Sequence, residues 1–214
     1  MSVDPAIHPE APAAAAALRA DPFFAAVIER LGPCRMPAPH GREPFEALLR
    51  AIAHQQLHGK AAEAILGRFI ALFPGSPFPT SAHVLAADPT RFRAAGLSAS
   101  KIAAILDLCT RHSAGEVPNL AVATKMSNEE LIASLIKIRG IGRWTVEMLL
   151  IFGLGRSDIL PVDDFGVREG YRKAARLDTQ PKPAALAAIG AAWAPWRSFA
   201  SWYLWQAAAV QWNP

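Results

Sequence analysis

The segment RGIGRWT, residues 139–145, places two glycines, two arginines and a threonine at the start of an apolar run. Gly140 and Gly142 can adopt positive φ angles and let another molecule approach the main chain, because neither has a Cβ. At a helix amino terminus, unpaired amides and the helix dipole favour an anion. Arg143 and Thr145 can add side-chain donors. The spacing indicates a phosphate site, and the alternative is a tight connection between two helices.

A second group with metal-ligand spacing is the histidine pair in HQQLHGK, His54 and His58. Zinc hydrolases of the HExxH type place a glutamate after the first histidine. Gln55 takes that place and no third ligand is evident, so we exclude a zinc hydrolase. The two cysteines, Cys34 and Cys109, form no CxxC motif and are too few to ligate an iron–sulfur cluster. This usage favours a reducing compartment.

The elements that must position these groups are helices. Apolar residues recur at three- and four-residue intervals, and alternating strand patterns are scarce. We therefore predict an all-α fold. The expected helices cover residues 45–53 and 61–72 around the polar break at 54–60, and also 22–31, 81–87, 89–95, 98–112, a segment from 127, 143–152, a segment from about 163, and most of 183–212.

Composition sets wider limits on the function. The 214 residues are 52% hydrophobic, so the chain can bury a sizeable core and is not wholly disordered. The net charge of +4 is compatible with a polyanionic partner, although many other proteins share it. Residues 1–18 contain no lysine or arginine, unlike a secretory signal, and we expect a loose leader there. No uncharged apolar run reaches the roughly 20 residues of a membrane span.

The segment LIKIRGIGRWTVEMLLIF and the following DILPVDDFGVREG resemble the helix-hairpin-helix DNA glycosylases, specifically the 3-methyladenine DNA glycosylase II branch. Three features carry the resemblance: the GIGRWT hairpin, an aspartate 20 residues beyond Trp144, and the terminal WAPWRSFASWYLW. It extends from about Asp21 to the end of the chain. Arg139 departs from the family, which usually has proline before the first glycine. We expect this change to loosen the hairpin or to add a phosphate contact.

The resemblance implies two helical subdomains with a cleft between them. Residues 42–156 form one subdomain and contain the hairpin at 138–143, and residues 19–41 with 157–214 form the other. It also gives Asp164 the position of the catalytic aspartate, ahead of Asp163. A carboxylate there stabilises the oxocarbenium character of the sugar or orients water while the bond to the base breaks. Capping the following helix is the alternative for either acid.

Three aromatic residues are candidates for the base pocket. Lyase-competent relatives have a lysine where this chain has Trp144, so chemistry through an amine is not expected. An indole face suits a cationic methylated purine, since cation–π attraction contributes about 0.5–2 kcal/mol. The terminal motif places Trp205 in the family's pocket, and Phe165 lies beside the candidate acid. Core packing is the alternative for each, and for Phe165 it is the role we prefer.

The polar stretch between two helices matches the family's wedge loop. A base must leave the duplex before hydrolysis, and an inserted side chain usually fills the gap. Leu57 is the expected wedge, since its neighbours are polar. His58 is expected to contact the minor groove, and Gln56 and Lys60 the DNA backbone. Solvated loop residues are the alternative.

The resemblance also implies a monovalent cation at hairpin carbonyls, which by position belong to Ile136, Ile138 and Ile141. No other cofactor is expected. The predicted partner is double-stranded DNA that contains alkylated bases, bound by a monomer in a bacterial nucleoid or in a nucleus.

The predicted reaction is hydrolysis of the N-glycosidic bond of alkylated purines, of the 3-methyladenine and 7-methylguanine type, which leaves an abasic site. One alternative is an oxidised-base glycosylase with lyase activity. The other is a catalytically silent hairpin protein that only binds DNA.

Overall fold

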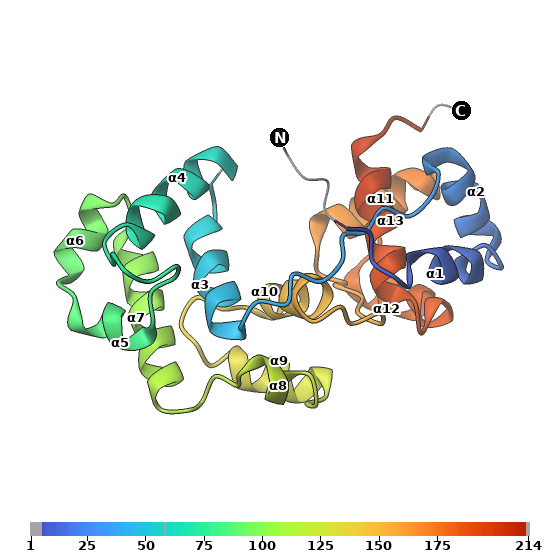
Figure 1. The fold of residues 1–214 in the computed structure, drawn as a ribbon. Helices are drawn as coiled ribbons and strands as arrows, with labels where there is room; N and C mark the ends of the chain where they lie inside the picture. Colours follow the sequence, from blue (N-terminus) through green and yellow to red (C-terminus); the bar gives the residue numbers. More distant parts are fainter. Residues whose placement is uncertain (1–5, 58, 213–214) are drawn as a thin grey trace. The chain divides into compact units, whose positions relative to one another are not determined.

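The computed structural model describes residues 6–57 and 59–212, and their secondary structure is almost entirely helical (Figure 1). Within these residues no sheet forms, and the extended pairing is an isolated antiparallel bridge between Ile7 and Pro37. The predicted all-α fold class is confirmed. Among the described residues, no helix has the length and apolar character needed to cross a membrane.

The helices follow one another as α1 (Ala11–Leu18), α2 (Pro22–Leu31), α3 (Pro44–His54), α4 (Gly59–Ile70), α5 (Ser81–Ala86), α6 (Pro89–Ala94), α7 (Ala99–Ser113), α8 (Leu120–Ala123), α9 (Asn128–Leu135), α10 (Arg143–Met148), the π-helix η1 (Leu149–Gly153), α11 (Phe165–Ala174), α12 (Pro183–Gly190), the 3₁₀ turn η2 (Ala191–Trp193) and α13 (Arg197–Ala209). Periodicity located most of them to within a few residues. It missed the short helix α8 and the change from α- to π-helical bonding after Met148.

The chain forms two compact units. One combines the described residues up to His40 with those from Leu150 onward, and the other spans Gly41–Leu149. The second boundary between the units lies between Leu149 and Leu150, whereas we predicted it after residue 156. The unit built from both ends also includes α1, which we expected to belong to a loose leader. An alanine-rich segment has high helix propensity, and Ala11, Ala14 and Leu18 are buried.

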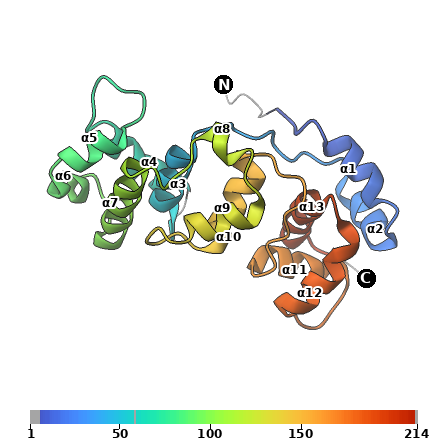
Figure 2. The same cartoon turned by 90° about the horizontal axis from the view of Figure 1, so that it is seen from below.

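In the unit built from both ends, α11 packs closely against α13, and α1 and α2 also contact α13 (Figure 2). A Cβ added to Gly170 on α11 would lie 1.8 Å from the carbonyl oxygen of Leu204 on α13. No side chain fits between the two backbones at that point. Phe24 and Tyr203 fill the neighbouring core and are fully buried.

In the unit that spans Gly41–Leu149, α7 packs against both α3 and α5. Its apolar face buries Ile105 and Leu108, which are fully enclosed. Helices α9 and α10 flank the glycine hairpin. Ser127 and Glu130 start α9 with a capping box, because each side chain accepts from the other residue's backbone amide.

Candidate active site and DNA-binding hairpin

The candidate acid Asp164 is the N-cap of α11. Its Oδ1 accepts a hydrogen bond from the backbone amide of Val167 at 2.7 Å. The capping role that we considered as an alternative is therefore real, and it does not exclude a catalytic role. The side chain also lies at the positive end of the helix dipole.

Trp205 holds the same carboxylate oxygen from α13. Its indole Nε1 donates to Oδ1 of Asp164 at 2.9 Å, and its ring lies 5.8 Å from that of Phe152. Gly166 makes room for this contact, because a Cβ there would lie 2.9 Å from Cδ1 of Trp205. Two donors from different helices thus fix the orientation of the acid. The terminal motif indicated that Trp205 lies near the site, but no pattern in the sequence indicated its hydrogen bond to Asp164.

Phe165 does not pack into the core, contrary to our preference. It occupies the first turn of α11 and is 70% exposed, whereas Val167 two residues later is fully buried. The start of α11 directs Val167 inward and Phe165 outward, so a large apolar ring is exposed next to the candidate acid. Asp163 is also exposed.

The two hairpin glycines have different backbone conformations. Gly140 has φ +77°, and a Cβ on it would lie 3.2 Å from Cβ of Ala104. Gly142 has φ −95° and ψ 168°, so the positive φ that we expected for it is wrong. This conformation is open to any residue, and a Cβ on Gly142 would meet no atom of the described chain within 4 Å. Its lack of a side chain leaves the approach to α10 open.

The side-chain donors beside the hairpin have partners within the chain. Arg143 forms ion pairs with Glu129 at 2.8 Å and with Glu147 at 3.0 Å. The hydrogen bond that Arg143 donates to Glu129 contributes most to raising the pKa of Arg143, and the guanidinium is half-exposed. Thr145 is only 8% exposed, and its amide donates to the carbonyl of Gly142. This burial does not fit the surface donor that we predicted.

Arg139 strengthens the hairpin instead of loosening it. Its backbone amide donates to Oδ2 of Asp107 on α7 at 2.7 Å. Proline, the usual residue of the family at this position, has no amide and could not form this bond. The departure from the family pattern therefore has a structural reason that was not evident from the sequence.

The loop between α3 and α4 contains the candidate wedge. Leu57 is 40% exposed, and Gln56 before it has a left-handed φ of 56°. Lys60 is exposed in the first turn of α4. His58 lies outside the described residues. Gln55, which we considered only as part of a failed zinc motif, donates from Nε2 to the carbonyl of Gly140 at 2.8 Å.

Trp144 is not a core residue. It lies on the first turn of α10 and is 49% exposed, so the packing alternative is excluded. Of the three residues proposed to offer carbonyls to a cation, Ile136 is exposed and Ile138 and Ile141 are buried. The carbonyl of Ile138 accepts from the amide of Ile141 at 3.1 Å.

His54 lies close to an acid on α4. Its Nε2 lies 3.2 Å from a carboxylate oxygen of Glu63. Among the described residues, no three His, Cys, Asp or Glu side chains are grouped so as to hold a metal ion. Cys34 and Cys109 are buried in different units, and burial raises their pKa values to about 11 and about 12.

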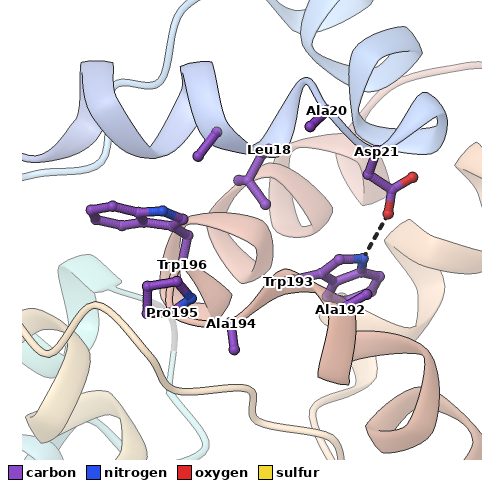
Figure 3. Close-up of a pocket in the computed structure, with 9 residues that line it drawn as sticks. Leu18, Ala20, Asp21, Ala192, Trp193, Ala194, Pro195 and Trp196 are labelled. Atoms are coloured by element: carbon purple, nitrogen blue, oxygen red, sulfur yellow. Dashed lines mark hydrogen bonds between the residues drawn. The ribbon is translucent and has the colours of Figure 1, made fainter.

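A cavity of about 560 Å³ lies beside α1 and η2 (Figure 3), and its lining includes none of the predicted site residues. Leu18, Pro195 and Trp196 line it together with small alanines. Its one acid, Asp21, accepts from the indole of Trp193 through Oδ2 and from a backbone amide of α2 through Oδ1. The carboxylate therefore serves as a helix cap and a packing contact.

Comparison with known proteins decides the family. Residues 49–195, which include the hairpin and Asp164, match the HhH-GPD superfamily of base excision DNA repair proteins. The chain belongs to this superfamily. Its resemblance to helix-hairpin-helix DNA glycosylases is thereby confirmed, and DNA is the expected partner of an HhH-GPD protein.

Individual HhH-GPD relatives agree with this assignment. The chain is 45% identical to DNA-3-methyladenine glycosylase 1 of Schizosaccharomyces pombe over 77% of this chain and 72% of the relative. A solved structure of an S. pombe 3-methyladenine DNA glycosylase in complex with abasic DNA has a TM-score of 0.83 and 40% identity, and the match covers 92% of this chain and 97% of that one. A DNA-3-methyladenine glycosidase from Bacillus halodurans has a TM-score of 0.82 and 32% identity, over 92% and 89% of the two chains.

Proposed function

We propose that this chain is a monofunctional DNA glycosylase, which hydrolyses the N-glycosidic bond of alkylated purines and leaves an abasic site. The observation that carries the proposal is the capped and doubly hydrogen-bonded carboxylate of Asp164, in a chain that belongs to a base excision repair superfamily. The names of the relatives support 3-methyladenine as a substrate.

Asp164 supplies the chemistry in this proposal. As the bond to the base breaks, positive charge develops on the sugar, and a fixed carboxylate stabilises that charge or orients the attacking water. The hydrogen bonds from Val167 and Trp205 keep the carboxylate in one orientation, so little reorganisation is needed during the reaction. A purine that is already cationic is a good leaving group and needs no strong general acid.

The aromatic residues select the base. Trp144 and Phe165 present exposed rings that can stack on a base, and a cationic methylpurine gains cation–π attraction from an indole. Trp205 is committed to Asp164 through its N–H group, so we propose that it contacts the base through its ring. A tryptophan in place of the lysine of lyase-type relatives leaves no amine at this position to attack the sugar.

The loop and the hairpin bind the DNA. Leu57 is the proposed wedge, with Gln56, His58 and Lys60 as contacts to the groove and the backbone. Gly140 and Gly142 let a phosphate approach the hairpin. Arg143, which is paired with Glu129 and Glu147, is a further proposed phosphate contact, whereas buried Thr145 supports the fold of α10.

We also propose a monovalent cation at the carbonyls of Ile136, Ile138 and Ile141. Uncharged main-chain oxygens suit such an ion. The bond from Ile141 to the carbonyl of Ile138 uses one of two lone pairs, so the donor set fits. The ion would add a positive charge beside a DNA phosphate. We propose that the protein acts as a monomer on chromosomal DNA, in a nucleoid or a nucleus.

The test is incubation of the protein with methylated duplex DNA. Released bases are identified by chromatography, and strand breaks are measured with and without alkali. The proposal predicts free methylpurines, with breaks that depend on alkali. Breaks without alkali would indicate a lyase, and bound DNA with no released base would indicate a binding protein; either result would refute the proposal.

A further inference from the structure

Two segments outside the hairpin hold it in place. Asp107 on α7 accepts the amide of Arg139 at 2.7 Å, and Gln55 after α3 donates to the carbonyl of Gly140 at 2.8 Å. Ala104, one turn before Asp107, is the small residue against which Gly140 packs. We call Gln55, Ala104 and Asp107 the hairpin clasp. Its contacts fix the main chain at two successive positions immediately before α10.

We propose that Gln55 and Asp107 are positioning residues, which hold the glycine hairpin and the wedge loop in one fixed arrangement for DNA binding. The inference rests on the proposed function in one respect, which is that the hairpin and the wedge loop both contact DNA. Gln55 and Leu57 belong to the same loop, so the bond from Gln55 to Gly140 connects the candidate wedge directly with the hairpin. Neither residue needs to touch the substrate.

Helix α7 is the common support of the two segments. Lys101 donates from Nζ to the carbonyl of Ala53 at 2.8 Å, which secures the last turn of α3 just before Gln55. Asp107 lies on the same helix and secures the hairpin. A rigid helix that holds both segments preserves their spacing before DNA arrives, so less order has to be imposed on binding.

Asp107 is suited to this role because it remains charged. Burial acts to raise its pKa, but the amide of Arg139 and the guanidinium of Arg111 outweigh this effect, and the net pKa is lower than usual. Arg111, one turn later on α7, donates from Nε to the same Oδ2 at 3.1 Å. A hydrogen bond to an ionised acceptor is stronger than one between neutral groups.

The test measures binding of an undamaged fluorescent duplex to Asp107→Ala, Asp107→Asn and Gln55→Met. The matched control is Glu46→Ala, because Glu46 on α3 is also a partly buried acid that pairs with an arginine four residues away, Arg50, and it lies far from the hairpin in sequence. Removal of either acid changes the net charge equally, which by itself favours DNA binding. Asparagine can still accept the amide of Arg139.

We expect Asp107→Ala and Gln55→Met to raise the Kd for the duplex about tenfold, the loss typical of one charge-assisted or well-placed hydrogen bond. In Asp107→Ala, the slope of log Kd against log salt concentration should decrease in magnitude by about one, which is the change expected when one phosphate contact is lost. Asp107→Asn should recover most of the affinity, and Glu46→Ala should bind at least as tightly as the wild type does. The Arg139 amide should exchange with solvent faster in Asp107→Ala.

The proposal is overturned if Asp107→Ala keeps wild-type affinity and salt dependence, or if Asp107→Asn loses as much affinity as Asp107→Ala. It is also overturned if Glu46→Ala weakens binding equally. Should Asp107→Ala fail to fold, Gln55→Met and Asp107→Asn decide the matter. Binding of undamaged duplex needs no excision. A wild-type protein that releases no methylpurine would therefore refute the proposed function, but the effect of the clasp variants on the Kd could still be measured.

Discussion

Replacing Asp164 by asparagine should separate its charge from its structural role. The asparagine carbonyl can still accept from the amide of Val167 and the indole of Trp205, because both donors address Oδ1. Asparagine is as good an N-cap as aspartate, and the loss of favourable interaction with the helix dipole costs about 0.3–1 kcal/mol. For a chain of this length, that lowers Tm by only a few degrees, at about 2–4 °C per kcal/mol.

The effect on catalysis should be much larger. Loss of one preorganised group that stabilises a transition-state charge typically lowers kcat by about 10²–10³-fold. Asp164→Ala should lose comparable activity and also about 2 kcal/mol of stability, since it removes the cap and leaves an indole N–H without its acceptor. The asparagine variant therefore isolates the chemical contribution.

The assay is single-turnover release of methylpurine from methylated duplex, with Tm and duplex Kd measured on the same samples. Asp163→Asn is the matched control, because it removes the same charge from the adjacent, exposed acid. It should release base at the wild-type rate. Release by Asp164→Asn within threefold of the wild type, at unchanged Kd, would refute the catalytic assignment.

Three further predictions concern packing, the wedge and acid stability. Gly170→Ala should lower the free energy of unfolding by at least about 1–3 kcal/mol, because its Cβ would overlap a backbone carbonyl of α13. The control is Gly67→Ala, which adds a Cβ in open space on α4 and should be neutral or stabilising. Equal shifts in Tm for the two variants would contradict the close packing at Gly170. Leu57→Ala should slow excision from duplex more than from single-stranded DNA, and equal losses would argue against a wedge. Glu169 has a pKa lowered to about 2, chiefly by its hydrogen bond from Arg172, so its ion pair contributes full stability above about pH 4.5 and loses it as the pH falls toward 2. Glu169→Gln should flatten that part of the stability profile, measured by denaturant unfolding, and an unchanged profile would contradict it.

Local patterns predicted the helices because their signals lie within a few residues of one another. The cap of α2 by Asp21 and the Ser127–Glu130 capping box are examples, because each joins residues only two or three positions apart. The position of the candidate acid came from the family resemblance. The structure then supplied its capping geometry, which the spacing of Asp164 and Val167 already allowed.

Contacts between distant residues could not be predicted in the same way. Trp205 and Asp164 are 41 residues apart, and Gln55 and Gly140 are 85 apart. Periodicity carries no information about such pairs. The exposure of Phe165 was also unexpected, because an aromatic residue next to an apolar run resembles a core residue until the direction of its helix is known.

The most direct test of the account is borohydride reduction during turnover on methylated duplex, with free base measured in parallel. Hydrolysis assisted by Asp164 predicts stoichiometric release of methylpurine and no protein covalently joined to DNA. A trapped protein–DNA adduct that forms at the rate of base release would show that an amine attacks the sugar, and would contradict the account.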